Sequence, residues 1–229
     1  MGCQLIRGNI FCTKAQTIVN TVNCVGIMGA GIALECRLRY PEMFLRYQEL
    51  CNNGEIDIGK LWLYKGEGRW ILNFPTKKHW KHPSKERYLT EGLEKFSEHF
   101  ARLGIESIAF PLLGASHGGL SSDVSFSLMN TYLDQLDLDI EIYEYDPFAP
   151  DDLYDRIKDK VVGFSAEELS QALKIRKDIC DRIKEAFFSP DIVQLNQIGK
   201  IRGIGIKTLE KVFSWATEPP QIQQGNLEL

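Results

Sequence analysis

The chain has 229 residues, 27 of them basic and 31 acidic, which gives a formal net charge of −4 at pH 7. This charge excludes a polycation that coats nucleic acid over its whole surface, and a content of 44% hydrophobic and 25% charged residues excludes a disordered or fibrous protein. At roughly 150 residues per domain, we expect one full domain and a smaller remainder.

Residues 1–148 alternate between short β-branched or aromatic runs and amphipathic stretches. The runs predict strands, and the stretches predict helices because their apolar residues recur every three or four positions. Strands that alternate with helices predict an α/β fold whose ligands bind in the loops after the carboxyl ends of the strands. The predicted strands are Gln4–Arg7, Thr17–Val22, Leu61–Tyr64, Trp70–Phe74, Ser107–Phe110 and Ile140–Tyr145. The predicted helices are Gly31–Arg39, Glu42–Asn52, Lys85–Leu103 and Val124–Leu136.

The segment Asp146–Asp152 combines two prolines with three acidic residues and interrupts this alternation, which predicts a domain boundary. Beyond it the pattern is helical, and the sequence shows no internal repeat. We expect a first domain at 1–148, a linker with one helix at 149–164, a helical domain at 165–216 and a flexible tail at 217–229.

The six cysteines include no C-x-x-C pair and no Cys/His cluster, so we expect no metal site. Scattered cysteines in a chain with a sizeable core are expected to be reduced thiols. The sequence shows no secretory signal and no apolar stretch of about 20 residues. We therefore expect a cytoplasmic protein without a membrane partner.

Two glycine-bearing loops follow predicted strands. Residues 20–35 carry Gly26, Gly29 and Gly31 just before a predicted helix, and residues 111–123 carry three glycines within six positions. Glycine lets backbone N–H groups approach an anion, and a helix N-terminus adds positive potential. Each loop alone also fits a structural turn, but together they favour a diphosphate held between them.

Residues 73–87 form a basic segment, with five basic residues and one acidic residue in an acidic chain. Aromatic side chains such as Trp80 are interleaved with the cations, an arrangement that suits single-stranded nucleic acid. A solvated charged loop is the alternative. Pro75 and Pro83 stiffen the segment, so Lys77 can be positioned to face the sugar of a nucleotide bound by the glycine loops.

Together these segments resemble a macrodomain, of the branch that contains the antitoxin DarG and the terminal ADP-ribose protein glycohydrolase. The resemblance covers residues 1–148 and rests on Gly8-Asn9-Ile10, NTVNCVGIMGAGIALE, NFPTKKHW and PLLGASHGGL. It implies a three-layer α/β/α sandwich around a mixed sheet. It also implies ADP-ribose in a cleft at the strand ends, as substrate moiety or product, with no separate cofactor.

The resemblance implies a role for each matching position. The adenine is expected at Asn9 and Ile10, where the Asn9 carbonyl oxygen can accept from an exocyclic amine in place of the family's usual Asp. Asn23 is expected near the distal ribose, and Tyr143 is either an adenine-side aromatic or a core residue. The implied ADP-ribose contacts are Asn9, Ile10, Asn20, Asn23, Gly29, Ala30, Gly31, Ile32, Thr76, Gly114, Ala115, Ser116, Gly118, Gly119 and Tyr143.

Lys77 matches the catalytic lysine of the branch, which implies that it acts at the distal ribose as a nucleophile or an electrostatic partner. Lys78 is the neighbouring alternative. The second loop lacks the aspartate of the human-type enzyme and has Ser116-His117 where the branch usually has Gly-Asn, so His117 is either a proton shuttle or a solvent-facing residue. A cysteine hydrolase built on Cys24 is a further alternative, without a nucleophile-elbow context.

Residues 191–213 resemble a helix-hairpin-helix motif, with Ile201–Thr208 between two helices. In that motif a Gly-Ile-Gly turn presents backbone N–H groups to a nucleic-acid phosphate without sequence preference. A helix pair that only packs is the alternative. The nucleic-acid contacts expected in the chain are Lys78, Trp80, Lys81, Lys200, Arg202, Gly203, Gly205 and Lys207.

These features predict an enzyme that hydrolyses the bond between ADP-ribose and a nucleobase. The expected substrate is ADP-ribosylated DNA in single-stranded form, and the resemblance adds a DarT-like toxin as a further partner. A hydrolase of protein-linked ADP-ribose and a non-catalytic ADP-ribose reader are the alternatives. Lys77 argues against the reader, which has no use for a lysine fixed at the distal ribose.

Overall fold

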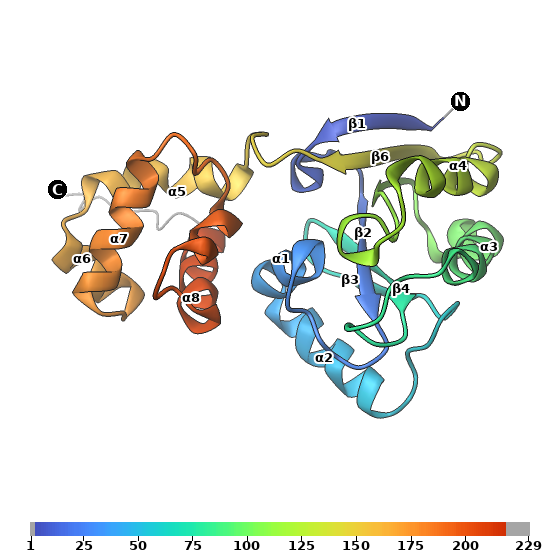
Figure 1. The fold of residues 1–229 in the computed structure, drawn as a ribbon, viewed down its shortest axis with the longest axis horizontal. Helices are drawn as coiled ribbons and strands as arrows, with labels where there is room; N and C mark the ends of the chain where they lie inside the picture. Colours follow the sequence, from blue (N-terminus) through green and yellow to red (C-terminus); the bar gives the residue numbers. More distant parts are fainter. Residues whose placement is uncertain (1–2, 219–229) are drawn as a thin grey trace, which may run out of the picture. The chain divides into compact units, whose positions relative to one another are not determined.

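A six-stranded mixed sheet forms the centre of the N-terminal part of the chain (Figure 1). The computed structural model describes residues 3–218 and divides the chain into two units, Met1–Asp152 and Leu153–Leu229. The strand order is β1-β6-β5-β2-β4-β3, and every neighbouring pair is parallel except β3 and β4. The strands are β1 (Gln4–Gly8), β2 (Thr17–Asn23), β3 (Trp62–Lys65), β4 (Trp70–Lys77), β5 (Ser107–Pro111) and β6 (Asp139–Tyr145).

Helices cover both faces of this sheet, which confirms the predicted three-layer α/β/α fold. Successive strand residues point to opposite faces, so Ile71 of β4 packs into one hydrophobic cluster and Leu72 into the other. The cluster around Ile71 includes residues of α1 (Gly31–Arg39) and α2 (Pro41–Asn52), and the cluster around Leu72 includes residues of α3 (Glu86–Leu103) and α4 (Ser122–Leu133).

The parallel arrangement determines where a site can form. The central strands β2, β4 and β5 run in the same direction, so the loops that follow them leave the sheet at the same edge. The register of β2 and β4 shifts between Val22 and Asn23, which brings Asn23 opposite Lys77. The first glycine loop, the basic segment and the second glycine loop all begin at this edge.

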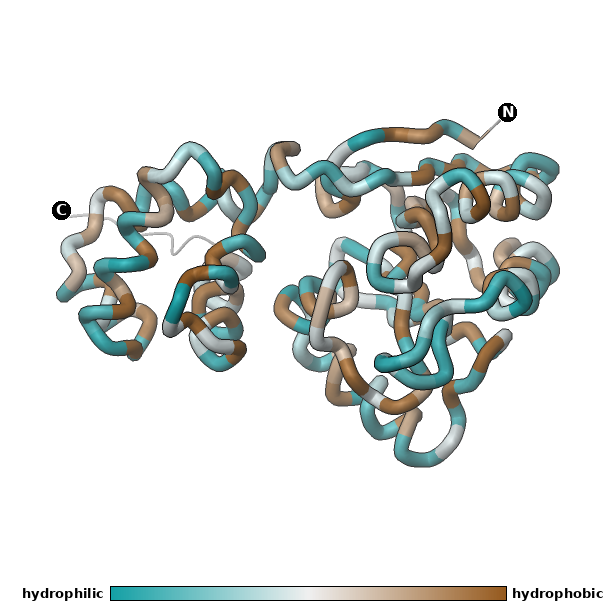
Figure 2. Tube along the Cα trace, viewed as in Figure 1, coloured by the Kyte–Doolittle hydropathy of each residue, from teal (hydrophilic) through white to brown (hydrophobic). Residues whose placement is uncertain are grey.

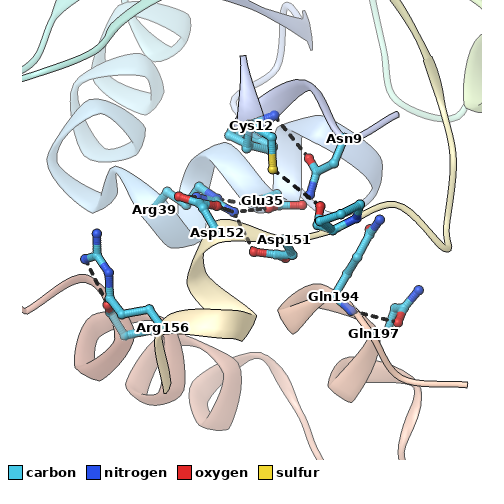
Figure 3. Close-up of polar contacts among 12 residues, drawn as sticks. Asn9, Cys12, Glu35, Arg39, Asp151, Asp152, Arg156, Gln194 and Gln197 are labelled. Atoms are coloured by element: carbon cyan, nitrogen blue, oxygen red, sulfur yellow. Dashed lines mark hydrogen bonds and ion pairs between the residues drawn. The ribbon is translucent and has the colours of Figure 1, made fainter. Parts of the chain in front are cut away.

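Arg39, the last residue of α1, binds the acidic segment that closes this unit (Figure 3). Its side chain is only 7% exposed and forms salt bridges of 2.8 Å with Glu35, 3.3 Å with Asp151 and 2.8 Å with Asp152. The guanidinium carbon also lies 4.2 Å from the centre of the Phe11 ring. The acidic segment that predicts a domain boundary is therefore held by a largely buried cation.

The second unit is helical throughout its described part. Hydrophobic and hydrophilic residues alternate along its helices, as expected for helices that bury one face (Figure 2). The helix expected before Ile201 is a 3₁₀ helix. No helix among residues 3–218 is long and apolar enough to cross a membrane. The elements are α5 (Asp152–Gly163), α6 (Ala166–Leu173), α7 (Lys177–Phe188), η3 (Leu195–Lys200) and α8 (Ile206–Thr217). Most of the predicted tail, 219–229, lies outside the described residues.

Candidate functional site

Three loops meet at the carboxyl edge of the sheet. Lys77, the last residue of β4, donates a hydrogen bond from Nζ to the carbonyl oxygen of His117 in the loop after β5. Gly31, the first residue of α1, faces the ring of the same histidine, because a Cβ added at Gly31 would lie 3.1 Å from His117 Cδ2. The structure therefore places the lysine and both glycine loops at one position.

The first loop is shaped by the buried side chain of Asn23. Its Oδ1 accepts from the backbone N–H of Val25 at 3.0 Å, and its Nδ2 donates to the carbonyl oxygen of Ile27 at 2.5 Å. The hydroxyl of Tyr47 donates to the Asn23 carbonyl oxygen at 2.6 Å. Through these hydrogen bonds, Asn23 stabilises the conformation of the first loop. They leave Gly29, Ala30 and Gly31 exposed at the N-terminus of α1, with Ile32 half-buried behind them.

The second loop is packed against the end of the basic segment. A Cβ at Gly118 would lie 2.7 Å from Ser84 Oγ, and the Ser84 N–H donates to the Gly118 carbonyl oxygen at 2.9 Å. A Cβ at Gly114 would lie 3.2 Å from Ser84 Cβ. No sequence pattern marks Ser84, yet it joins two of the predicted segments.

Ser116 has a positive φ of 47°, in the left-handed region that favours glycine. The resemblance places glycine at this position in the DarG branch, so the backbone here keeps a shape that its own side chain disfavours. Ala115 is half-buried, and Gly119 is exposed with a φ of 83°. The second loop thus presents its backbone around residues 115–119 toward the first.

Adjacent lysines leave β4 in different directions. Lys77 is half-buried, and burial lowers the pKa of its amine below that of an ordinary lysine. The ammonium group of Lys78 lies 3.3 Å from a carboxylate oxygen of Asp57, in a largely exposed ion pair. Lys77, and not Lys78, is the amine that reaches the second glycine loop.

Cys24 lies beside the lysines, with its Sγ 3.4 Å from the carbonyl oxygen of Lys77. Burial, together with the nearby carboxylate of Asp57, raises the pKa of this thiol to about 12. The nucleophilic thiolate is therefore scarce at neutral pH. The structure gives no support to a cysteine hydrolase at this position.

The basic segment continues from Lys77 into an exposed aromatic surface at residues 79–82, which we call the Trp80 patch. Trp80 is 50% exposed, and its ring stacks on His79 with centroids 5.7 Å apart. The ammonium group of Lys81 lies 5.1 Å from the Trp80 ring centre, and His82 lies 5.3 Å from His79. This surface can stack a planar group and attract an anion together.

Asn9 precedes a short 3₁₀ helix (Ile10–Cys12) and is 5% exposed. Its Oδ1 accepts from the Phe11 N–H at 3.1 Å, whereas its Nδ2 is buried and has no partner among the described residues. The Asn9 side chain therefore offers a ligand an unpartnered donor, beside the carbonyl oxygen expected from the sequence, which keeps a second lone pair. Ile10 is buried beside it, and half-buried Tyr143 donates its hydroxyl to Glu141 at 3.0 Å.

Two predicted contacts lie in the sheet interior. Asn20 has no exposed surface, and its Nδ2 donates to Asn73 Oδ1 in the facing strand at 2.9 Å. We therefore correct the prediction for Asn20, whose amide stabilises the pairing of β2 with β4. Thr76 is 4% exposed in β4, one residue before Lys77. Within residues 3–218, no group of three or more His, Cys, Asp or Glu side chains is placed to hold a metal.

Comparison with known proteins identifies the family. The Macro domain family matches residues 19–129. The solved macrodomain of Thermus aquaticus DarG is 37% identical, with a TM-score of 0.59, and the match covers 62% of this chain and 97% of that one. The chain belongs to the macro domain family. This confirms the predicted resemblance to a macrodomain. The match to the family lies within the N-terminal unit.

Two further relatives extend the comparison. The DNA ADP-ribosyl glycohydrolase of Mycobacterium tuberculosis (strain ATCC 25618 / H37Rv) is 43% identical over 141 residues, which are 59% of this chain and 40% of that protein. The structure of Thermosipho africanus DarTG in complex with ADP-ribose is 32% identical, with a TM-score of 0.58, and covers 62% of this chain and 42% of that one. The chain spans about two fifths of the length of the curated relatives it matches.

Proposed function

We propose that the macrodomain unit binds ADP-ribose and hydrolyses the glycosidic bond that joins it to a nucleobase in DNA. The observation that carries this proposal is the position of the Lys77 amine, half-buried and in contact with the second glycine loop opposite Gly31. A relative at 43% identity carries the name of this activity, and another macrodomain neighbour was solved with ADP-ribose.

The binding part of the proposal rests on backbone groups and one amide. The exposed N-terminus of α1 at Gly29–Gly31 offers N–H groups and positive potential to the diphosphate, and residues 115–119 face it from the other loop. The unpartnered Nδ2 of Asn9 would donate to an acceptor nitrogen of the adenine ring. This would satisfy a donor that is otherwise buried without a bond.

The catalytic step that we propose is an attack by Lys77. The neutral amine bonds to the anomeric carbon of the distal ribose, and the carbon–nitrogen bond to the base breaks, with its electron pair and a proton going to the base. Water then displaces the lysine, which releases ADP-ribose and restores the amine. The lowered pKa of Lys77 increases the neutral fraction available for attack. The exposed His117 ring, beside Gly31, would carry the proton to the departing base.

The Trp80 patch would bind the DNA strand next to the modified base. Its stacked indole and imidazole rings and the Lys81 cation match the bases and phosphates of a single strand. We place this reaction in the cytoplasm, supported by six cysteines that are all free thiols. A DarT-like transferase would supply the substrate, in line with the DarTG neighbour.

The decisive experiment compares two substrates under one assay. An oligonucleotide ADP-ribosylated on a base and a protein ADP-ribosylated on carboxylates are incubated with the chain, and released ADP-ribose is measured by liquid chromatography. We expect release from the oligonucleotide. Release from the protein alone would assign the carboxylate-linked activity, and binding of ADP-ribose without release from either would assign a reader.

Lys77→Ala tests the catalytic residue in the same assay. It should lower the rate on DNA at least about 100-fold while ADP-ribose affinity, measured by calorimetry, stays within about threefold. Lys78→Ala is the matched control and should retain most of kcat, because its ammonium pairs with Asp57 and the loss of a predicted DNA contact raises KM alone. Normal turnover by Lys77→Ala would remove this residue from the mechanism.

A further inference from the structure

The hydroxyl of Ser84 is buried at the second glycine loop and has no hydrogen-bond partner among the described residues. Ser84 is 5% exposed, and a Cβ added at Gly118 would lie 2.7 Å from its Oγ. A buried hydroxyl without a hydrogen bond reduces the stability of a protein, so it calls for a role that offsets this cost. The Ser84 hydroxyl therefore points to a bond that forms in another state of the site.

Capping of helix α3 does not account for this hydroxyl. The N-cap residue of the helix is Lys85, whose side chain forms no capping bond, and the Ser84 hydroxyl bonds to no N–H group of the helix. Ser84 uses its backbone instead, because its N–H donates to the carbonyl oxygen of Gly118 at 2.9 Å. The side chain of Ser84 thus faces the loop that contains Gly114 and Gly118, and not the helix that follows it.

Two hydrogen bonds hold the second glycine loop at consecutive peptide units. Lys77 Nζ donates to the carbonyl oxygen of His117. The Ser84 N–H donates to the next carbonyl oxygen, that of Gly118. Ser116, just before these two residues, has a φ of 47°, a conformation that a residue other than glycine keeps only where surrounding contacts hold it. Loss of either bond would therefore allow the loop to relax.

The bond from Lys77 weakens during the reaction proposed above. A hydrogen bond from an amine to a carbonyl is strongest while the amine is charged, whereas attack requires the neutral amine with its lone pair directed at the ribose. Once the nitrogen is bonded to the anomeric carbon, the sugar determines its position. The His117 carbonyl oxygen then loses its donor at the step in which the loop must hold the diphosphate.

We propose that Ser84 is a positioning residue, whose hydroxyl binds the His117 carbonyl oxygen when the Lys77 amine leaves it. The Ser84 Oγ lies beside Gly118, which shares a peptide bond with this carbonyl, and a serine hydroxyl changes direction by rotation about two single bonds. The strained loop thus keeps its shape while the lysine reacts. The departure of the lysine rests on the proposed function, but the exchange of donors can be tested without catalysis.

Urea unfolding of the full chain, followed by circular dichroism, tests the exchange without substrate. In the unmodified chain, Ser84→Ala removes an unpaired buried hydroxyl, so the unfolding midpoint should stay the same or rise. In Lys77→Met the His117 carbonyl has lost its amine and the Ser84 hydroxyl should bind it. Adding Ser84→Ala to Lys77→Met should therefore lower the midpoint. Equal shifts in the two backgrounds would overturn the proposal, whether or not the chain hydrolyses a substrate.

Release of ADP-ribose from modified DNA tests the consequence for the reaction. Ser84→Ala should lower kcat at least about tenfold and change KM less than about twofold, because the hydroxyl acts only in the reacting state. A role in ground-state binding would raise KM instead, and normal kcat in Ser84→Ala would contradict the positioning role.

Ser125→Ala is the matched control for both measurements. Ser125 is also fully buried beside the second loop, but its hydroxyl already donates to the carbonyl oxygen of Leu113 at 2.7 Å. Its loss should lower the urea midpoint and keep kcat within about twofold. An equal fall in kcat for Ser84→Ala and Ser125→Ala would indicate general disturbance of the loop and would also overturn the proposal. Absence of release by the unmodified chain would refute the hydrolase proposal alone, since the urea comparison decides the exchange.

Discussion

Lys77 is the residue whose environment decides the chemistry of the site. Burial lowers the pKa of its amine, and its hydrogen bond to the His117 carbonyl oxygen holds the amine against the second glycine loop. Desolvation favours the neutral form of a lysine, which is the form that a nucleophile requires and an electrostatic partner does not. The two roles therefore differ in how the rate should depend on pH.

We predict that kcat/KM rises with pH and levels off above the lowered pKa of Lys77. Below that pKa the amine is protonated and cannot attack, and above it the neutral fraction is saturated. Rates on modified DNA between pH 6 and about 10 would measure this profile. A rate that falls as Lys77 loses its proton would assign the electrostatic role instead.

Gly31 tests the diphosphate site. Glutamate at this position would add a carboxylate to the proposed diphosphate site and would place a Cβ 3.1 Å from the His117 ring, so ADP-ribose affinity should fall at least about 30-fold by calorimetry. Gly54→Glu is the control, because Gly54 also has a positive φ of 72° but no neighbour within 4 Å of its added Cβ. Equal affinities for the two variants would contradict the assignment of the diphosphate site.

At the scale of single residues, the sequence shows which residue types belong to the candidate site, but it shows less well how each side chain is oriented. The motif around residues 73–80 identifies Lys77, and the structure separates it from Lys78 by their different partners. Asn20 and Asn23 belong to the same motif, yet one pairs two strands and the other shapes a loop. Which way each asparagine points depends on the register of β2 and β4, which a single sequence does not reveal.

At the scale of elements, hydrophobic periodicity is sufficient to predict the strands and helices of the first unit to within a few residues. Each strand buries alternate residues on opposite faces, and each amphipathic helix buries one stripe, so both leave a strong pattern. The helix at Leu195–Lys200 is predicted without its 3₁₀ type, because six residues are too few for periodicity to distinguish a 3₁₀ helix from an α-helix. The ion pairs of Arg39 with Asp151 and Asp152 leave no sequence pattern, since these carboxylates come from a distant segment.

Arg39→Ala should destabilise the first unit by about 3 kcal/mol, because it removes the guanidinium from two largely buried carboxylates, Glu35 and Asp151. Urea unfolding followed by circular dichroism measures this loss. Arg46→Ala is the matched control, since the Arg46–Glu49 pair is about 60% exposed and should contribute less than about 0.5 kcal/mol. Equal midpoints for both variants would show that the Arg39 cluster adds no stability.

At the scale of the whole molecule, the chain combines two units whose structures are specified in different ways. The first places glycine loops and an amine at one edge of a mixed sheet, and the second uses one backbone plan, a capping box and a final 12-residue helix, at both 165–188 and 194–217. The site of the first unit can be predicted because its chemistry requires particular residue types in the loops, and these are visible in the sequence. The shared backbone plan of the second unit cannot be predicted in this way. It is specified by capping, burial and φ, and different residue types satisfy these requirements equally well.

The diphosphate site proposed at Gly31 and the nucleic-acid contacts predicted at Arg202 and Lys207 should act independently in one chain. Gly31→Glu should leave duplex affinity unchanged, and the Arg202→Glu, Lys207→Glu pair should leave ADP-ribose affinity unchanged, with combined effects additive within about 0.5 kcal/mol. On a modified single-stranded segment flanked by duplex, the Arg202→Glu, Lys207→Glu variant should raise KM at least about threefold with kcat unchanged, since uniform substrate binding affects KM alone. On a short modified oligonucleotide without a duplex arm, its KM should match that of the unmodified chain. A lower kcat on both substrates would instead place the second unit in the catalytic step.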